Sequence, residues 1–200
     1  MSTLVESKGE RTRRAILSRA AALGSERGLE ALTIGGLAEE LRMSKSGLFA
    51  HFGSKEELQL ATIGHASQTF VEEVIAPARP APRGIARVWA LCDHLVSYLE
   101  RQVFPGGCPM QAGSVEFKSR PGPVRDRVRG LREDWLSYFA HAIGTAQELG
   151  ELRADVEPRA LAFELDALAF GANVHFQLFD DPQYFAAARD AMRARLDALR

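Results

Sequence analysis

The segment Thr33–Leu58 constrains the fold most, because it contains two short helical repeats, a tight break between them and the start of a third helix. Apolar residues recur at i, i+3, i+4 and i+7 from Ile34 to Leu41, and Thr33 stands where an N-cap is needed. Ser44 is placed to cap a second short helix after the break. Two helices joined by a turn of this length form a helix-turn-helix.

The first turn of the second helix has the composition of a DNA-reading surface. It consists of Ser44, Lys45, Ser46 and Gly47. In a helix-turn-helix this turn meets base edges in the major groove. Small hydroxyls and a glycine allow a close backbone approach, and the lysine can reach a phosphate or the acceptors of guanine. The sequence therefore predicts binding to double-stranded DNA.

A third helix is expected to start directly afterwards. Ser54 is its predicted N-cap, and Glu57 supplies the acid of a capping box. The free amides of its first turn, together with Lys55, make a candidate anion site that suits a phosphate.

These residues resemble the DNA-binding domain of the TetR family of bacterial transcriptional regulators. The resemblance covers about the first third of the chain and rests on residues at fixed spacing, namely Thr33-Ile34, Ser44-Lys45, Leu48-Phe49, His51-Phe52 and Ser54 through Leu58. It implies that Ser44 to Gly47 read or approach bases. It also implies that Thr33, His51 and Lys55 hold phosphates.

Two residues depart from the family pattern. Phe49 stands where the family usually has a tyrosine that donates to a phosphate, so that contact is expected to be missing at this otherwise DNA-facing position. Arg42 stands where a glycine commonly makes a left-handed turn, and a non-glycine residue there costs about 1 kcal/mol.

The charge of the whole chain gives no general attraction to nucleic acid, because the formal net charge is −1. DNA binding must therefore depend on a local patch. Lys8, Arg11, Arg13 and Arg14 form a basic cluster just before the helix-turn-helix. The cluster faces DNA phosphates on one interpretation and is a solvated helix face on the other.

The sequence predicts a soluble protein of the cytoplasm. Its two cysteines, Cys92 and Cys108, are too few for a disulfide scaffold, and the chain opens with no secretory leader. No stretch approaches the roughly 18 consecutive apolar residues that a membrane span needs.

The rest of the chain shows helical repeats and no β alternation, so the fold is expected to be all-α. Residues 1–60 are predicted to be the DNA-binding domain, and residues 61–200 a larger helical domain. The helix that starts near Ser54 is expected to continue to Ala76, where Pro77 stops it, and so to connect the two domains.

The C-terminal part resembles, more weakly, the ligand-binding and dimerisation domain of the same family. The resemblance rests on Gly107-Cys108, Arg120 through Arg125, Trp135, Gly150 through Leu152, and Leu161 through Leu165. It implies a homodimer in which the last two helices of each copy pair about a twofold axis. Symmetry gives the same expectation, because two recognition helices must stand about 34 to 36 Å apart to bind a palindrome.

Cys108 is a candidate redox or electrophile sensor. It lies in a glycine-proline break before a predicted helix, where the amide end of a helix lowers a thiol pKa. The alternative is a buried structural cysteine that fills a turn. Cys92 lies on an apolar helix face and is expected to be core.

Three polar residues flank an apolar stretch near the end of the chain and are candidates for a ligand cavity. They are Asn173, His175 and Gln177. Ligand pockets combine apolar walls with a few hydrogen-bonding groups, which fits this pattern. The same residues would equally suit an interface or a core.

No enzyme motif, metal-ligand spacing or cofactor signature is found, so neither catalysis nor a cofactor is expected. The sequence predicts a DNA-binding transcriptional regulator, a repressor released from a palindromic operator by a small-molecule effector or a thiol-reactive signal. Two alternatives stay open: an activator of the same fold, and a helical adaptor that binds only protein.

Overall fold

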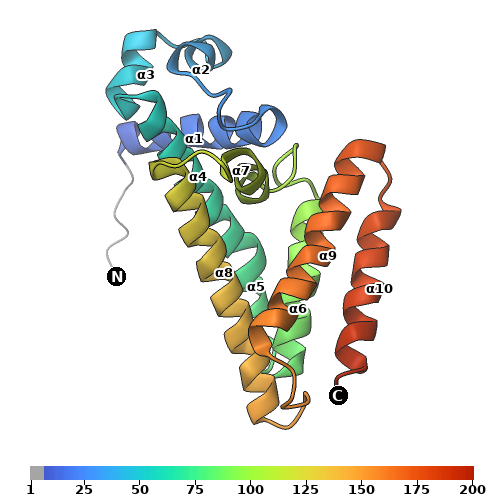
Figure 1. The fold of residues 1–200 in the computed structure, drawn as a ribbon. Coiled ribbons are helices and arrows are strands. Elements are labelled where there is room, and N and C mark those ends of the chain that lie inside the picture. Colours follow the sequence, from blue (N-terminus) through green and yellow to red (C-terminus); the bar gives the residue numbers. More distant parts are fainter. Residues whose placement is uncertain (1–6) are drawn as a thin grey trace. The chain divides into compact units, whose positions relative to one another are not determined.

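The structure is a computed structural model that describes residues 7–200, and every regular element in that range is a helix (Figure 1). The all-α prediction is confirmed. The chain forms two compact units. Unit 1 is Met1–Gln68 with Phe104–Val128, and unit 2 is Thr69–Val103 with Arg129–Arg200. The first six residues of the expected DNA-binding domain lie outside the described residues.

Unit 1 contains the three helices expected at the N-terminus. Its elements are α1 (Lys8–Arg27), α2 (Ile34–Glu40), α3 (Lys45–Phe52), most of α4 (Lys55–Phe70), α7 (Pro109–Phe117) and the start of α8 (Pro123–Glu148). Its core is made of the apolar residues that repeat along these helices, among them Ile16, Leu29, Leu37, Leu48, Phe52, Leu58 and Ile63.

Local signals placed the starts of α2 and α3 correctly. The hydroxyl of Thr33 accepts from the amide of Gly36 at 3.0 Å, and that of Ser44 accepts from Gly47 at 3.1 Å. Between the two helices Arg42 has a φ of 53°, in the left-handed region that the sequence predicted for it. An arginine therefore makes the turn that a glycine makes at lower cost.

The segment around α7 packs against the turn between α1 and α2. The carboxylate of Glu116 accepts from the backbone amides of Leu29 at 2.8 Å and Glu30 at 2.9 Å. The amide of Gly106 donates to the hydroxyl of Ser25 at 2.9 Å. Residues 104–128 thus belong to unit 1 by packing, although they lie within the range 61–200 expected for a second domain. The functional division near residue 60 stays a prediction.

The helical path that begins with α4 extends two residues farther than expected. It continues through a π-helical segment, η1 (Val71–Ile75), and ends in α5 (Ala76–Ala78), so Pro77 lies inside it. The amide of Ala76 bonds to the carbonyl of Val71, one residue wider than in an α-helix. A π turn is one of the adjustments that accommodate the donor missing at a proline.

Unit 2 is a helical assembly around an aromatic cluster. It holds η1, α5, α6 (Ile85–Glu100), most of α8, α9 (Pro158–Phe179) and α10 (Gln183–Asp197). The ring of Phe70 meets Trp135 edge-on at 5.0 Å between centroids and Tyr98 at 5.6 Å. Trp135 stacks on Phe139. These rings form the centre of the unit.

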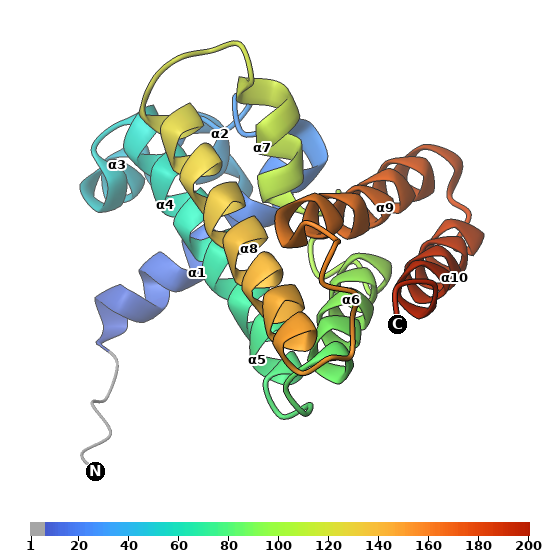
Figure 2. The ribbon, with the colours of Figure 1, turned by 60° about the horizontal axis from the view of Figure 1, so that its bottom comes forward.

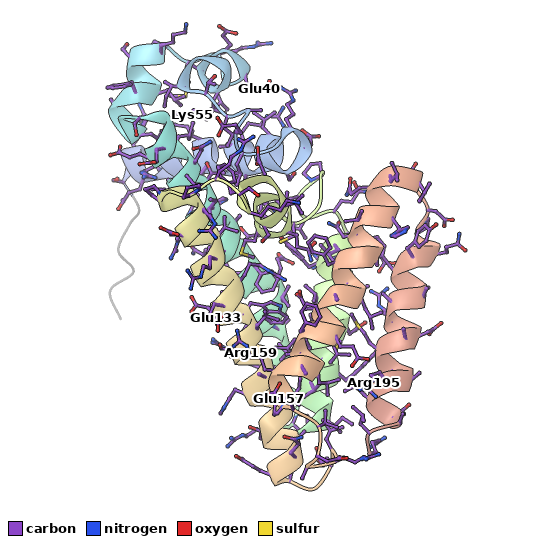
Figure 3. The ribbon with its side chains drawn as sticks, in the orientation of Figure 1. Glu40, Lys55, Glu133, Glu157, Arg159 and Arg195 are labelled. Atoms are coloured by element: carbon purple, nitrogen blue, oxygen red, sulfur yellow. The ribbon has the colours of Figure 1, made fainter. Side chains whose placement is uncertain are left out.

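The last two long helices lie antiparallel and side by side, and both pack on α6 (Figures 1 and 2). Arg159 at the start of α9 pairs with Glu133 of α8 at 2.6 Å (Figure 3). Within residues 7–200, no helix combines the length and the apolarity that crossing a bilayer would need.

Candidate nucleic-acid interface

The tip of α3 is open to solvent in unit 1. Ser44, Lys45 and Ser46 are exposed, while Leu48 and Phe52 on the opposite side of the helix are buried. Ser46 donates to the capping hydroxyl of Ser44 at 3.3 Å. Neither a hydrogen bond nor an ion pair engages the ammonium group of Lys45 in the part of the chain that the structure describes. The four residues predicted to read bases therefore share one accessible turn.

Two glycines leave room for the side chains of this turn, Gly47 within the turn and Gly35 in α2. A Cβ at Gly47 would lie 3.0 Å from the hydroxyl of Ser44, so a larger residue would crowd the N-cap. A Cβ at Gly35 would lie 3.1 Å from Cε of Lys45, which shows that the lysine stem lies over α2. Sequence reasoning assigned Gly47 to close DNA approach and missed its role in the cap.

Phe49 and His51 follow on the same helix. Phe49 is 56% exposed, a high value for a phenylalanine, and lies on the accessible side of α3. His51 is half-buried, with its ring 6.1 Å from that of Phe52. The guanidinium of Arg13 in α1 lies over the ring of Phe52, 4.7 Å from its centroid. This contact joins α1 to α3.

The two remaining phosphate candidates lie at helix starts. The exposed hydroxyl of Thr33 accepts one amide bond at the start of α2 and keeps its own proton to donate. Lys55 lies in the first turn of α4 (Figure 3). The amide of Glu57 donates to Ser54 at 3.0 Å, as the predicted cap requires.

Glu30 is a member of this site that sequence reasoning missed. Its carboxylate accepts from Lys55 at 2.7 Å and from Gln59 at 3.4 Å. The hydrogen bond from Lys55 lowers the pKa of Glu30 below its ordinary value, against the opposing effect of burial. No local pattern predicts this pair, because it joins the turn after α1 to the start of α4.

The basic cluster of α1 is well anchored. Ser7 and Glu10 form a reciprocal capping box, which holds the first turn of the helix. Lys8 and Arg11 are exposed. Farther along, Arg19 forms an ion pair with Glu40 that links α1 to the end of α2. The exposed cations therefore belong to a helix that is fixed to the helix-turn-helix.

The candidate sensor Cys108 is 3% exposed and lies at the N-cap position of α7. Its predicted place at the amide end of a helix is thus confirmed, while the burial favours the structural alternative. Cys92 is fully buried in α6, and this burial raises the pKa of its thiol far above the ordinary value. Neither cysteine forms a disulfide bond within residues 7–200.

The three candidate ligand residues of α9 do not share one environment. Asn173 is buried, whereas His175 and Gln177 are exposed. Nδ1 of His175 lies 2.8 Å from the carbonyl of Gly171, and its ring lies tilted against that of Tyr184, with 4.9 Å between the centroids. Within residues 7–200, no group of three His, Cys, Asp or Glu side chains is arranged to hold a metal ion.

Two family descriptions match the chain. Residues 16–62 match "Bacterial regulatory proteins, tetR family", and residues 84–192 match "Tetracyclin repressor-like, C-terminal domain". The first range contains the helix-turn-helix, and the second covers more than half of the sequence.

Two curated proteins are similar to this chain at low identity. The transcriptional regulator AcuR of Cereibacter sphaeroides is 25% identical over 146 residues, which cover 69% of this chain and 64% of AcuR. The nucleoid occlusion factor SlmA of Haemophilus influenzae is 26% identical over 150 residues, 74% of this chain and 67% of SlmA. The chain thus spans about two thirds of the length of these relatives.

Solved structures share the whole fold. A TetR transcriptional regulator of Chloroflexus aurantiacus superimposes with a TM-score of 0.88 at 26% identity, over 95% of this chain and 96% of that one. The structure of AibR in complex with isovaleryl coenzyme A and operator DNA has a TM-score of 0.70 at 23% identity, over 94% and 97%.

Proposed function

The chain belongs to the tetR family of bacterial regulatory proteins and is a DNA-binding transcriptional regulator, and we propose that it represses transcription from a palindromic operator until a signal releases it. One observation carries the DNA-reading part, namely the exposed, serine-capped tip of α3 with Lys45 unengaged. A helical adaptor without DNA binding does not fit this family. An activator would use the same contacts, and a reporter gene distinguishes the two by the sign of its response.

In this proposal α3 enters the major groove with its first turn toward the bases. Ser44, Lys45, Ser46 and Gly47 approach base edges, and Phe49 lies beside them. Helix starts bind anions through their free amides, so Thr33 and Lys55 are suited to flanking phosphates. His51 and the exposed cations of α1 add phosphate contacts. A protein of this kind works where the chromosome is, in the cytoplasm.

The second part of the proposal is a homodimer formed through α9 and α10. Large apolar side chains of α9 are exposed along one side, with Phe163 at 64%, Val174 at 47% and Leu178 at 71%. Alanines are exposed at helical spacing from Ala187 through α10 to Ala198 at its C-cap. Contiguous apolar surface of this kind marks a protein interface, and a second copy supplies the symmetry that a palindrome requires.

The third part concerns the signal. AibR was crystallised with isovaleryl coenzyme A and operator DNA, which supports a small-molecule effector for this chain also. A ligand can release the operator only if it binds the released arrangement more tightly than the DNA-bound one. Modification of Cys108 is the second candidate signal. Replacing Cys108 by serine should abolish an oxidant response, and an unchanged response would remove this residue as the sensor.

The DNA-binding proposal is tested with genomic fragments captured by the purified protein, followed by anisotropy titrations on the recovered site. Lys45→Ala should weaken binding by about 1–3 kcal/mol if the lysine touches a base, and affinity should fall steeply with salt. Lys118→Ala, an exposed lysine away from the tip, is the matched control. Full affinity of the Lys45 variant at every salt concentration would refute the assignment of α3.

The dimer is tested separately by light scattering. Leu178→Asp places a charge on the exposed side of α9 and should shift the protein toward monomer. Val115→Asp changes an equally apolar and 53% exposed residue of α7 and should leave the dimer intact. A monomeric parent protein, or a dimer unaffected by Leu178→Asp, would contradict this part of the proposal.

A further inference from the structure

A pocket opens at one end of unit 2, between the start of α6 and the last turns of α8, which lie together in both views (Figures 1 and 2). Its volume is about 280 Å³. Five polar side chains line it, namely Arg83, Arg87, Tyr138, His141 and Thr145. None of them belongs to the candidate ligand residues that the sequence suggested.

The pocket wall carries two guanidinium groups, those of Arg83 and Arg87. Neither guanidinium has a carboxylate within ion-pair distance among residues 7–200, and Arg83 makes no hydrogen bond in that range. Arg87 is held in place by its own loop, since its Nε and Nη2 donate to the carbonyl of Ala81 at 3.1 and 2.7 Å. Two neighbouring cations without a counter-charge repel each other, so an anion between them is favoured.

The carboxylate of Glu151, which lies beside Gly84 of the pocket wall, is engaged by the backbone. The carboxylate of Glu151 accepts from the backbone amide of Ile85 at 2.7 Å, at the first turn of α6. A Cβ at Gly84 would lie 2.1 Å from this carboxylate, so Gly84, with a φ of +99°, is required for the contact. Glu151 therefore caps the helix and leaves the guanidinium groups to another anion.

The opposite wall supplies groups for the remainder of a small organic molecule. Tyr138, His141 and Thr145 are spaced i, i+3 and i+7 and so share one face of α8. The hydroxyl of Thr145 donates to the carbonyl of His141 at 3.0 Å, which leaves its oxygen to accept from a ligand hydroxyl or amine. Gly84 and Ala142 keep the rest of the wall small and apolar.

We infer that this pocket binds a small organic oxyanion, with its carboxylate or phosphate group between Arg83 and Arg87 and its body against Tyr138 and His141. Guanidinium groups match the planar fork of a carboxylate and the oxygens of a phosphate equally, so both share the chemistry. The volume is at the lower end for ligand pockets and suits a small metabolite. That this anion acts as the effector rests on the proposed function, whereas its binding does not.

The binding test uses the full chain without DNA. Inorganic phosphate and succinate are titrated at constant ionic strength, and the imidazole signals of His141 are followed by NMR after assignment with His141→Gln. We expect a saturable shift with at least one probe, and the probe that gives it identifies the anionic group. Arg83→Gln should weaken binding by about tenfold or more, because a charge-assisted hydrogen bond is lost.

Arg79→Gln is the matched control, since Arg79 is exposed, lies four positions before Arg83 and is not part of the pocket wall. Arg87→Gln tests the second cation, but it also breaks the bonds to Ala81. Arg83 makes no such bonds, so its variant keeps the test independent of folding. Absence of a saturable shift with both probes, or equal weakening by Arg79→Gln, would overturn the site.

The effector role is measured afterwards by operator affinity at a saturating concentration of the probe that binds. A change in the parent protein that is absent in Arg83→Gln would support it. Unchanged operator affinity despite saturable anion binding would overturn the effector role alone. If the protein fails to bind the operator even without a probe, the proposed function is contradicted. The test of operator binding is therefore separate from the tests of the anion site and of its effector role.

Discussion

The ammonium group of Lys55 lies 2.7 Å from Oε1 of Glu30. The lysine assigned to a DNA phosphate is therefore paired with a carboxylate in the free protein. Arg120 adds a weaker contact to the same carboxylate, 3.8 Å from Oε2. In the proposed complex, a DNA phosphate replaces this carboxylate at Lys55, and Glu30 opposes the exchange both by holding Lys55 and by its own charge.

Replacing Glu30 by glutamine should tighten operator binding by up to about fivefold, because exposed ion pairs contribute about 0.2–1 kcal/mol. Anisotropy titrations at fixed low salt measure the change. Glu39→Gln removes the same charge from an exposed residue that does not hold Lys55. An equal gain in that control would show that net charge alone, and not the pair, limits binding.

The same pair predicts a pH dependence of stability. The hydrogen bond from Lys55 lowers the pKa of Glu30 below 4.5 in the folded protein. The pair therefore stabilises the fold above pH 4.5, and its contribution is lost as the pH falls through the lower, folded pKa. Lys55→Met should raise the pKa of Glu30 and reduce the unfolding free energy by less than about 1 kcal/mol at neutral pH.

Carboxyl NMR titration and urea unfolding at neutral and acidic pH measure both effects. The stability difference between the parent protein and Lys55→Met should shrink in acid. If the stability difference between the two proteins grows as the pH falls, the ion pair of Lys55 and Glu30 does not stabilise the fold as described.

Phe49→Tyr should tighten operator binding by about twofold to tenfold, because one new hydrogen bond contributes about 0.5–1.5 kcal/mol. The side chain is 56% exposed, so the added hydroxyl meets no core packing. Phe49→Ala controls for the ring and should leave the unfolding midpoint nearly unchanged. If the parent protein and the Phe49→Tyr variant bind the operator equally, the side chain of residue 49 does not reach a phosphate.

Helix ends and the helix-turn-helix could be predicted from the sequence, because caps depend on residues three or four positions apart. Thr33 and Ser44 are such cases, and the strained turn at Arg42 followed from the family pattern. The contact of Glu116 with the amides of Leu29 and Glu30 could not be predicted, since only tertiary packing brings these segments together. The cationic pocket was missed for the same reason.

Arg42→Gly should stabilise the protein by about 0.5–1 kcal/mol. The left-handed conformation costs a side-chain-bearing residue about 1–2 kcal/mol, and the greater freedom of glycine in the unfolded chain cancels part of the gain. Arg79→Gly is the control, because Arg79 has a φ of −58° and gains nothing from glycine. Thermal and urea unfolding decide the question, and destabilisation of both variants alike would exclude strain at Arg42.

Asp166 interrupts the apolar run of α9, and the structure explains why a charge is found there. The residue is 3% exposed. Its Oδ1 accepts from the indole nitrogen of Trp135 at 2.9 Å, and the guanidinium of Arg132 pairs with both carboxylate oxygens. One buried carboxylate thus accepts from two side chains of α8 and fixes α9 against it.

Asp166→Ala should therefore destabilise the protein by about 3–5 kcal/mol, because it leaves a mostly buried guanidinium and an indole N–H without this acceptor. Asp166→Asn keeps an acceptor for Trp135 and should lose less stability than Asp166→Ala. Glu164→Ala, two positions earlier, breaks only the part-exposed pair with Arg195 and should cost less than about 1 kcal/mol. Alanine is the best helix former, so helix propensity cannot cause a loss at either position of α9. Equal losses for the two alanine variants in urea unfolding would therefore contradict a special contribution of the buried acceptor.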